Sequence, residues 1–120
     1  MNRSQFIRLC DIRDGIDEIE EMSSGADFAS YKEDRKLRRA TERCVEIISE
    51  ASRHVPDSVK AEFSEIPWHE ISAIGNLLRH DYQIVSDFVM WKISGQSLTD
   101  LRRVVSIVID RIEQAQRKPK

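Results

Sequence analysis

Residues Pro67–Tyr82 read PWHEISAIGNLLRHDY, and this stretch predicts one helix of a helical bundle. Pro67 suits the first helical position, because proline has no N–H to leave unpaired there and its φ is already helical. Apolar side chains then recur at three- and four-residue intervals, the spacing of a helix with one buried face: Trp68, Ile71, Ile74 and Leu78. Leu77 is also expected to point toward the core.

Two amphipathic helices are predicted before this stretch. The first carries apolar residues at helical intervals from Phe6 to Ile19, and the small residues of Ser23–Gly25 end it. The second begins at Asp27 or at Ser30, each of which can cap a helix with its side chain. It is expected to continue as one long helix until the chain meets Pro56.

Two further helices are predicted after it. A short one begins near Ser86 or Asp87 and stops before Gly95, and the last is opened by Ser97 and Asp100, which are spaced as a capping box. No segment shows the alternation of apolar and polar residues that is typical of a half-buried strand. The sequence therefore predicts an all-α fold, a single domain over residues 1–120 built as an antiparallel bundle of four to five helices.

The composition sets limits on the class of protein. The 120 residues are 40% hydrophobic and 33% charged, with a formal net charge of −2, a balance typical of a globular chain without a global basic field. Charged residues interrupt the N-terminal apolar residues at every turn, which excludes a signal peptide or a membrane span there and favours a cytoplasmic location. Cys10 and Cys44 are expected to be buried thiols rather than a disulfide or a metal pair.

Most of the chemically reactive side chains are concentrated between Pro67 and Trp91. Asn76 and His80 lie four residues apart and so share a helix face, and Arg79 lies next to His80. An imidazole, whose ordinary pKa is about 6.5, can accept and return a proton near neutral pH, and a guanidinium can grip a phosphate. These groups suit metal-independent cleavage of RNA, in which a base accepts the 2′-hydroxyl proton and a cation stabilises the phosphoryl oxygens.

Other interpretations of these residues stay open. The same string suits a solvated helix end whose tyrosine packs on the core. The three histidines show no metal-site spacing, and no cofactor motif occurs, so neither a metal nor a cofactor is expected. The run KEDRKLRR, Lys32–Arg39, mixes both charge signs and is more typical of a solvated helix face than of an RNA groove. Glu42 and Glu50 are left outside the predicted site.

On these residues the chain resembles the HepT-like family of the HEPN superfamily. The resemblance spans nearly the whole chain and is most specific in the spacing from Trp68 to His80, followed by Tyr82 and Trp91. It implies a helical bundle that pairs as a symmetric homodimer, with a composite ribonuclease site in the cleft between subunits. It also implies a toxin–antitoxin system, with a minimal nucleotidyltransferase (MNT) as antitoxin partner and Tyr82 as the residue that the partner adenylylates.

One position departs from the family pattern. The family motif has arginine before an asparagine and then histidine after four to six residues, whereas here Gly75 precedes Asn76. In the favoured interpretation Arg79 supplies the guanidinium, so the predicted catalytic residues of an active endoribonuclease are Asn76, Arg79 and His80. In the alternative the protein has little nuclease activity and is a binding partner or substrate of the nucleotidyltransferase, modified at Tyr82.

Overall fold

The computed structural model describes residues 1–80 and 85–117, and every regular element within these ranges is helical. Four long helices form the body: α1 (Arg3–Ser23), α3 (Arg35–Ser52), α5 (Trp68–His80) and α7 (Leu98–Arg117). Short helices lie between them, namely α2 (Phe28–Glu33), α4 (Asp57–Glu62) and α6 (Asp87–Lys92), and a π-helical turn, η2 (Ile93–Ser97), joins α6 to α7. The predicted all-α bundle is confirmed.

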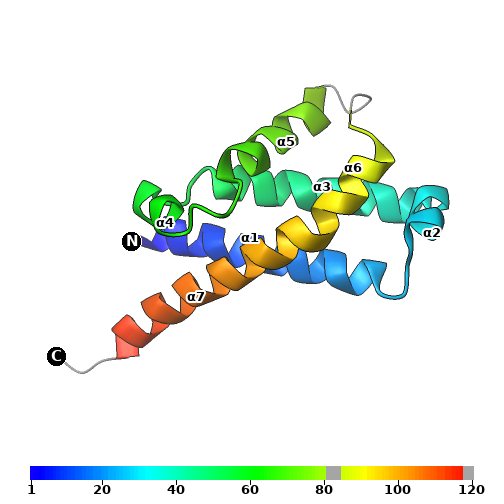
Figure 1. Cartoon of the computed structure of the whole chain (residues 1–120). Helices are drawn as coiled ribbons and strands as arrows, with labels where there is room; N and C mark the ends of the chain where they lie inside the picture. Colours follow the sequence, from blue (N-terminus) through cyan, green and yellow to red (C-terminus); the bar gives the residue numbers. More distant parts are fainter. Residues whose placement is uncertain (81–84, 118–120) are drawn as a thin grey trace.

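Helix α3 lies in the middle of the bundle, between α1 and α5, and runs antiparallel to both (Figure 1). Helix α7 crosses α1 and ends beside its first turn, where Ile112 and Gln116 line a hollow together with Phe6. The Cα positions extend over 55 × 28 × 23 Å, so the bundle is elongated. Among the long helices α5 packs mainly on α3, and part of its surface stays open to solvent.

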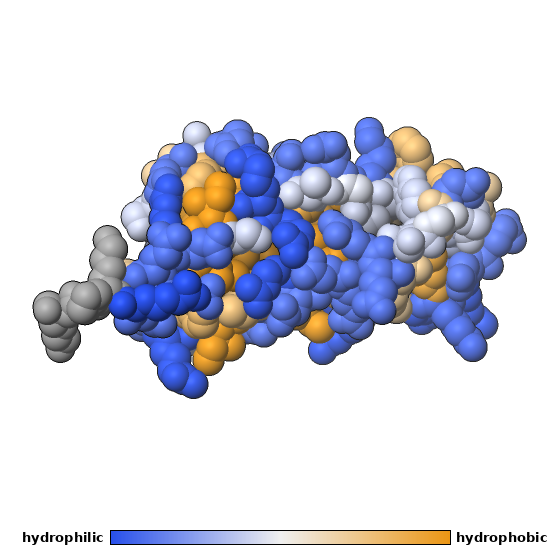
Figure 2. Space-filling view, turned by 90° about the horizontal axis from the view of Figure 1, so that it is seen from below, coloured by the Kyte–Doolittle hydropathy of each residue, from blue (hydrophilic) through white to orange (hydrophobic). Residues whose placement is uncertain are grey.

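The core is built from the apolar stripes that the periodicity predicts. Leu9, Ile12, Ile16 and Ile19 of α1 are fully buried, as are Leu101, Val104 and Val105 of α7. Burying one such side chain contributes roughly 1.5–3 kcal/mol, so these stripes hold the long helices together. The face seen in Figure 2 is mainly hydrophilic, with the hydrophobic residues in separate patches.

The predicted long second helix is wrong, because the chain breaks at Asp34. Asp27 caps α2 by accepting a hydrogen bond from the Ser30 N–H, with Ser30 completing the capping box. Asp34 then leaves helical geometry, with φ −100° and ψ 95°, and its carboxylate accepts a hydrogen bond from the Leu37 N–H. The side-chain cap at Asp34 thus ends one helix and opens the next, and α3 starts at Arg35.

The junction between the last two helices also differs from the prediction. Helix α6 begins after the Ser86 cap and ends at Lys92, before Gly95, as predicted, but the π-helical turn η2 then joins it directly to α7. Gly95 absorbs the kink with φ −91° and ψ −109°. The Asp100 carboxylate accepts a hydrogen bond from the Gln96 amide, so the capping box predicted for Ser97 and Asp100 is not what forms there.

Candidate functional site

The contact between α3 and α5 depends on small residues. The Ser49 hydroxyl accepts a hydrogen bond from the Gly75 N–H at 3.0 Å and donates one to the Ser72 carbonyl, also at 3.0 Å. Ser52 extends this polar seam, donating to the Ser49 carbonyl and lying 3.2 Å from the Ser72 hydroxyl. Because Ser49 and Ser52 are buried, their hydroxyl groups are removed from water, and these hydrogen bonds replace the bonds to water that they lose.

Gly75 packs tightly against Ser49 of α3. A Cβ at this position would lie 2.5 Å from the Ser49 Oγ and 2.7 Å from its Cβ, far inside normal contact distance. Gly75 is therefore needed for packing, and no side chain at this position could reach solvent without separating the two helices. The departure from the family motif coincides with a buried position, so an arginine here is incompatible with this packing.

The three predicted catalytic residues are all exposed, on the last two turns of α5. On an ideal helix Arg79 projects about 40° from the direction of Gly75, and His80 projects about 140° from it. Arg79 thus leans toward the α3 side of the helix, whereas His80 points away from α3. Asn76 lies one turn below both and is within neighbour distance of each.

Residues 81–84 lie outside the described residues, and so the proposed modification site, Tyr82, has no described position.

Leu77 was predicted to point toward the core, and this prediction is wrong. The side chain is 38% exposed, because it lies on the opposite side of α5 from the α3 contact. It borders two hollows. One, of about 530 Å³, holds the predicted residue Asn76 together with His69 and Arg53. The other, of about 250 Å³, is lined mainly by apolar atoms of α5 and η2, among them Ile74 and Ile93.

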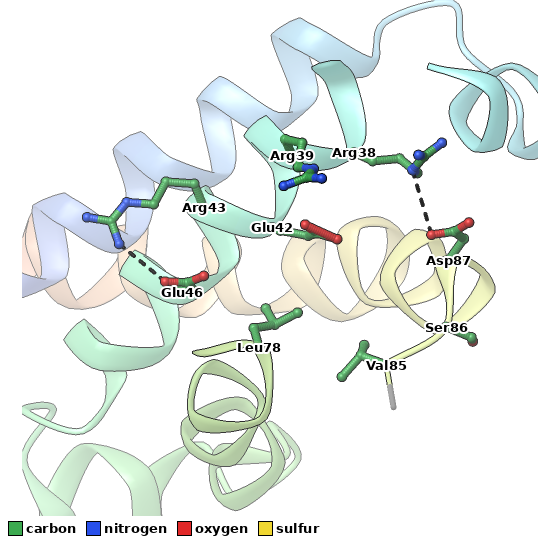
Figure 3. A pocket seen from close by; sticks show the side chains of 9 residues that line it. All are labelled: Arg38, Arg39, Glu42, Arg43, Glu46, Leu78, Val85, Ser86 and Asp87. Atoms are coloured by element: carbon green, nitrogen blue, oxygen red, sulfur yellow. Dashed lines mark hydrogen bonds and ion pairs between the residues drawn. The ribbon is translucent and has the colours of Figure 1, made fainter. Parts of the chain in front are cut away.

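A larger groove of about 740 Å³ lies where the end of α5 meets α3 and α6 (Figure 3). One wall is a row of charged side chains on α3: Arg38, Arg39, Glu42, Arg43 and Glu46. The other wall is made by Leu78 of α5 and by the chain entering α6: Val85, Ser86 and Asp87. Since Leu78 directly precedes Arg79, this groove adjoins one of the predicted catalytic residues, Arg79.

Sequence reasoning missed this groove. It treated Lys32–Arg39 as a solvated face and left Glu42 out, because one sequence does not say which turn of α3 meets the end of α5. The antiparallel packing brings Glu42, but not Glu50, beside that end; Glu50 instead lies 3.6 Å from the His54 imidazole. Burial raises the pKa of Glu42, and the nearby carboxylates of Asp87 and Glu46 add to this effect, while Arg39 opposes it.

The two cysteines do not belong to the candidate site. Cys44 is buried as predicted, and burial raises its pKa to about 11, whereas Cys10 is only partly buried; both are free thiols. In the described ranges no group of three or more histidine, cysteine, aspartate or glutamate side chains could hold a metal ion. Nor does any helix in those ranges have the length and apolar character to span a membrane.

Comparison with known proteins gives the family. The model of the family described as Ribonuclease HepT-like matches residues 12–108, and this chain belongs to that family. It is 35% identical to a Thermococcus cleftensis protein named "Probable ribonuclease HepT" over 85% of this chain and 93% of that one. It is 29% identical to a Methanocaldococcus jannaschii protein named as a candidate RNase, over 83% and 92% of the two chains. None of the solved protein structures matches the chain.

Proposed function

We propose that this protein is an endoribonuclease that cleaves RNA without a metal ion, with Asn76, Arg79 and His80 as its catalytic residues. The observation that carries the proposal is the placement of Arg79 and His80 as exposed neighbours at the end of α5, with Asn76 one turn below. His80 accepts the proton of the ribose 2′-hydroxyl, and that oxygen attacks the adjacent phosphorus to form a 2′,3′-cyclic phosphate. The bond from phosphorus to the 5′-oxygen breaks, and the departing 5′-oxygen takes a proton from water. Arg79 stabilises the charge on the phosphoryl oxygens, and Asn76 orients the side chains of Arg79 and His80.

The position of Arg79 supports its part in this scheme. Gly75 faces α3 and has no room for a side chain, whereas Arg79 lies one turn further on nearly the same side of α5 and is exposed. A guanidinium at position 79 therefore reaches the solvent beside His80 without disturbing the seam of α3 and α5. Membership of the HepT-like family and the names of the similar proteins support the same activity.

We further propose that the active form is a homodimer whose site lies between the subunits. Arg79 and His80 diverge by about 100° around α5, so a single copy directs them to different sides of the helix. A two-fold axis beside α5 would place His80 of one subunit near Arg79 of the other. The exposed Leu77 and the apolar hollow next to it supply a surface for that contact.

The partner we propose is a minimal nucleotidyltransferase antitoxin that neutralises the protein by adenylylating Tyr82, within a toxin–antitoxin system. In the competing scheme the same modification occurs on a chain with little nuclease activity. Incubating the protein with the neighbouring nucleotidyltransferase and ATP, then measuring the intact mass, tests the modification: Tyr82→Phe should abolish the added AMP. An unchanged wild-type mass with an active transferase would contradict this partner.

RNA cleavage in the presence of EDTA tests the nuclease itself. The wild-type protein should cleave, whereas His80→Ala and Arg79→Ala should each lose at least a hundredfold in rate, the scale of a lost proton-transfer or charge-stabilising group. His69→Ala is the matched control, because His69 is an equally exposed histidine at the other end of α5. Full activity in His80→Ala, or loss of activity in His69→Ala alone, would overturn the assignment.

A further inference from the structure

Within residues 1–80 and 85–117, one carboxylate and one guanidinium of the groove beside the end of α5 have no ion-pair partner. Glu46 is paired with Arg43 at 3.2 Å, and Asp87 with Arg38 at 3.8 Å, so four of the six charged groups in the groove neutralise one another. In the described part of the chain no ion pair forms at Glu42 or Arg39. Glu42 lies between the two pairs, with Arg39 on the neighbouring turn above it (Figure 3).

Glu42 is therefore a carboxylate with no hydrogen-bond or ion-pair partner among the described residues. Its side chain is partly buried, and this burial is the main reason that its pKa is raised. A partly desolvated carboxylate gains most from donors that a ligand brings into the groove. Leu78 and Val85 form the apolar side of the same groove, where a flat ring could pack.

These features together fit one nucleotide of a single-stranded RNA. The volume, about 740 Å³, is in the usual range for small-ligand pockets. Arg39 offers a cation for a phosphate, Leu78 and Val85 offer an apolar wall for a base, and Glu42 offers two acceptor oxygens for the edge of that base. Among the four bases guanine alone presents two adjacent donors, N1–H and the N2 amino group, that match the two oxygens of a carboxylate.

We propose that this groove binds a guanine next to the scissile phosphate, with the Glu42 carboxylate accepting hydrogen bonds from N1–H and the N2 amino group and Arg39 holding a flanking phosphate. The inference rests on the proposed ribonuclease function, because the groove adjoins Arg79 through Leu78. The Watson–Crick edge must be unpaired to reach Glu42, so the substrate class is single-stranded RNA that contains guanine. Glu42 and Arg39 then determine specificity rather than catalyse the reaction.

Binding of 2′-O-methyl trinucleotides tests the base preference without cleavage. The probes AGA, AIA and AAA differ only in the central base: inosine lacks the N2 amino group, and adenine lacks both donors. Wild-type protein should bind AGA on the order of tenfold or more tightly than AAA, with AIA between them. Glu42→Gln should remove most of this difference, while Glu50→Gln, on the same helix but outside the groove, should keep it.

The outcomes separate this inference from the nuclease proposal. Equal binding of AGA and AAA by the wild type, or an unchanged preference in Glu42→Gln, would overturn the guanine site whether or not RNA is cleaved. Conversely, a guanine preference that depends on Glu42 would support the site even if His80→Ala cleaved normally and the catalytic assignment failed. Arg39→Gln should weaken all three probes by a similar factor, since a phosphate contact carries no base preference.

Discussion

The backbone N–H of Gly75 donates a hydrogen bond to the Ser49 hydroxyl at 3.0 Å, and this contact sets the distance between α3 and α5. The same serine donates to the Ser72 carbonyl one turn earlier on α5. The three catalytic candidates and the groove depend on this contact, because it fixes the register in which the end of α5 lies beside Glu42 of α3.

Gly75→Ala should destabilise the fold. In an open helix this change would stabilise by about 1 kcal/mol through helix propensity, but here the new Cβ would lie 2.5 Å from the Ser49 Oγ. We expect a net loss of about 1–3 kcal/mol in the free energy of unfolding, measured by urea titration. Asn76→Ala, on the exposed face of the same turn, should be nearly neutral, and Ser49→Gly should partly rescue Gly75→Ala. A more stable Gly75→Ala protein would contradict the close contact.

Leu77→Lys should weaken the proposed homodimer and reduce RNA cleavage together. The side chain is 38% exposed on the face of α5 that borders the apolar hollow, so a charge there would be buried without a partner in a dimer. Light scattering after gel filtration measures the oligomeric state. Ile7→Lys is the matched control, because Ile7 is 47% exposed on α1. If the dimer persists in Leu77→Lys but dissociates in Ile7→Lys, the interface includes the surface around Ile7 and not the surface around Leu77.

Asp17→Asn should lower stability at neutral pH and lose its effect in acid. The Arg102 guanidinium holds the Asp17 carboxylate by two hydrogen bonds, one of them at 3.2 Å, and these hydrogen bonds lower the pKa of Asp17. A lowered folded-state pKa means stability that is present above the unfolded pKa, about 3.9, and lost as the pH falls through the folded value. Because both side chains are well exposed, the difference should be at most about 1 kcal/mol.

Thermal unfolding of the Asp17→Asn protein between pH 2 and pH 7 follows this effect. Asp14→Asn is the control, since the Asp14 side chain is 70% exposed and, among the residues that the structure describes, pairs only with its neighbour Arg13. If the melting temperatures of wild type and Asp17→Asn differ by the same amount down to the lowest pH, the ion pair is not the source of that difference.

Glu42→Gln should have the opposite pH dependence. Burial raises the pKa of Glu42, so the folded state disfavours the charged carboxylate. Wild-type stability should fall as the pH rises through the unfolded and then the folded pKa of this group. The glutamine variant lacks that loss, so it should melt at a higher temperature than wild type at pH 7, with the advantage gone below about pH 4. A lower melting temperature at neutral pH would mean that the charge is satisfied within the protein.

Tyr31→Phe should leave the fold intact. The Tyr31 hydroxyl is buried and has no hydrogen-bond partner among the described residues, while the ring packs on Trp91 with centroids 5.2 Å apart. Removing an unsatisfied hydroxyl from a buried site is neutral or stabilising. Burial, with Glu42 and Asp87 nearby, raises the pKa of Tyr31 to about 12, so phenolate absorbance from it should appear only there. A marked loss of stability in Tyr31→Phe would reveal a bonded hydroxyl.

Much of the fold follows from local patterns. The stripes of α1 and α5, the stop after Ser23 and the Ser86 cap all depend on residues within a turn or two of each other, and these predictions are confirmed. The break at Asp34 also has local signals that the prediction of one long helix overlooked: an N-cap aspartate three residues before Leu37, and no apolar residue between Tyr31 and Leu37.

The sequence by itself determined that the chain is an all-α bundle, that it carries the HepT-like pattern around His80, and that Asn76, Arg79 and His80 belong to one helix. It did so because periodicity and caps are local, and because a motif on one helix keeps its spacing wherever the helix packs. Only the tertiary structure decided that Gly75 is a packing residue, that Leu77 is exposed, and that Glu42 faces the end of α5. Each of these depends on the register between two helices, which is set by how their side chains fit together and not by the spacing within either one.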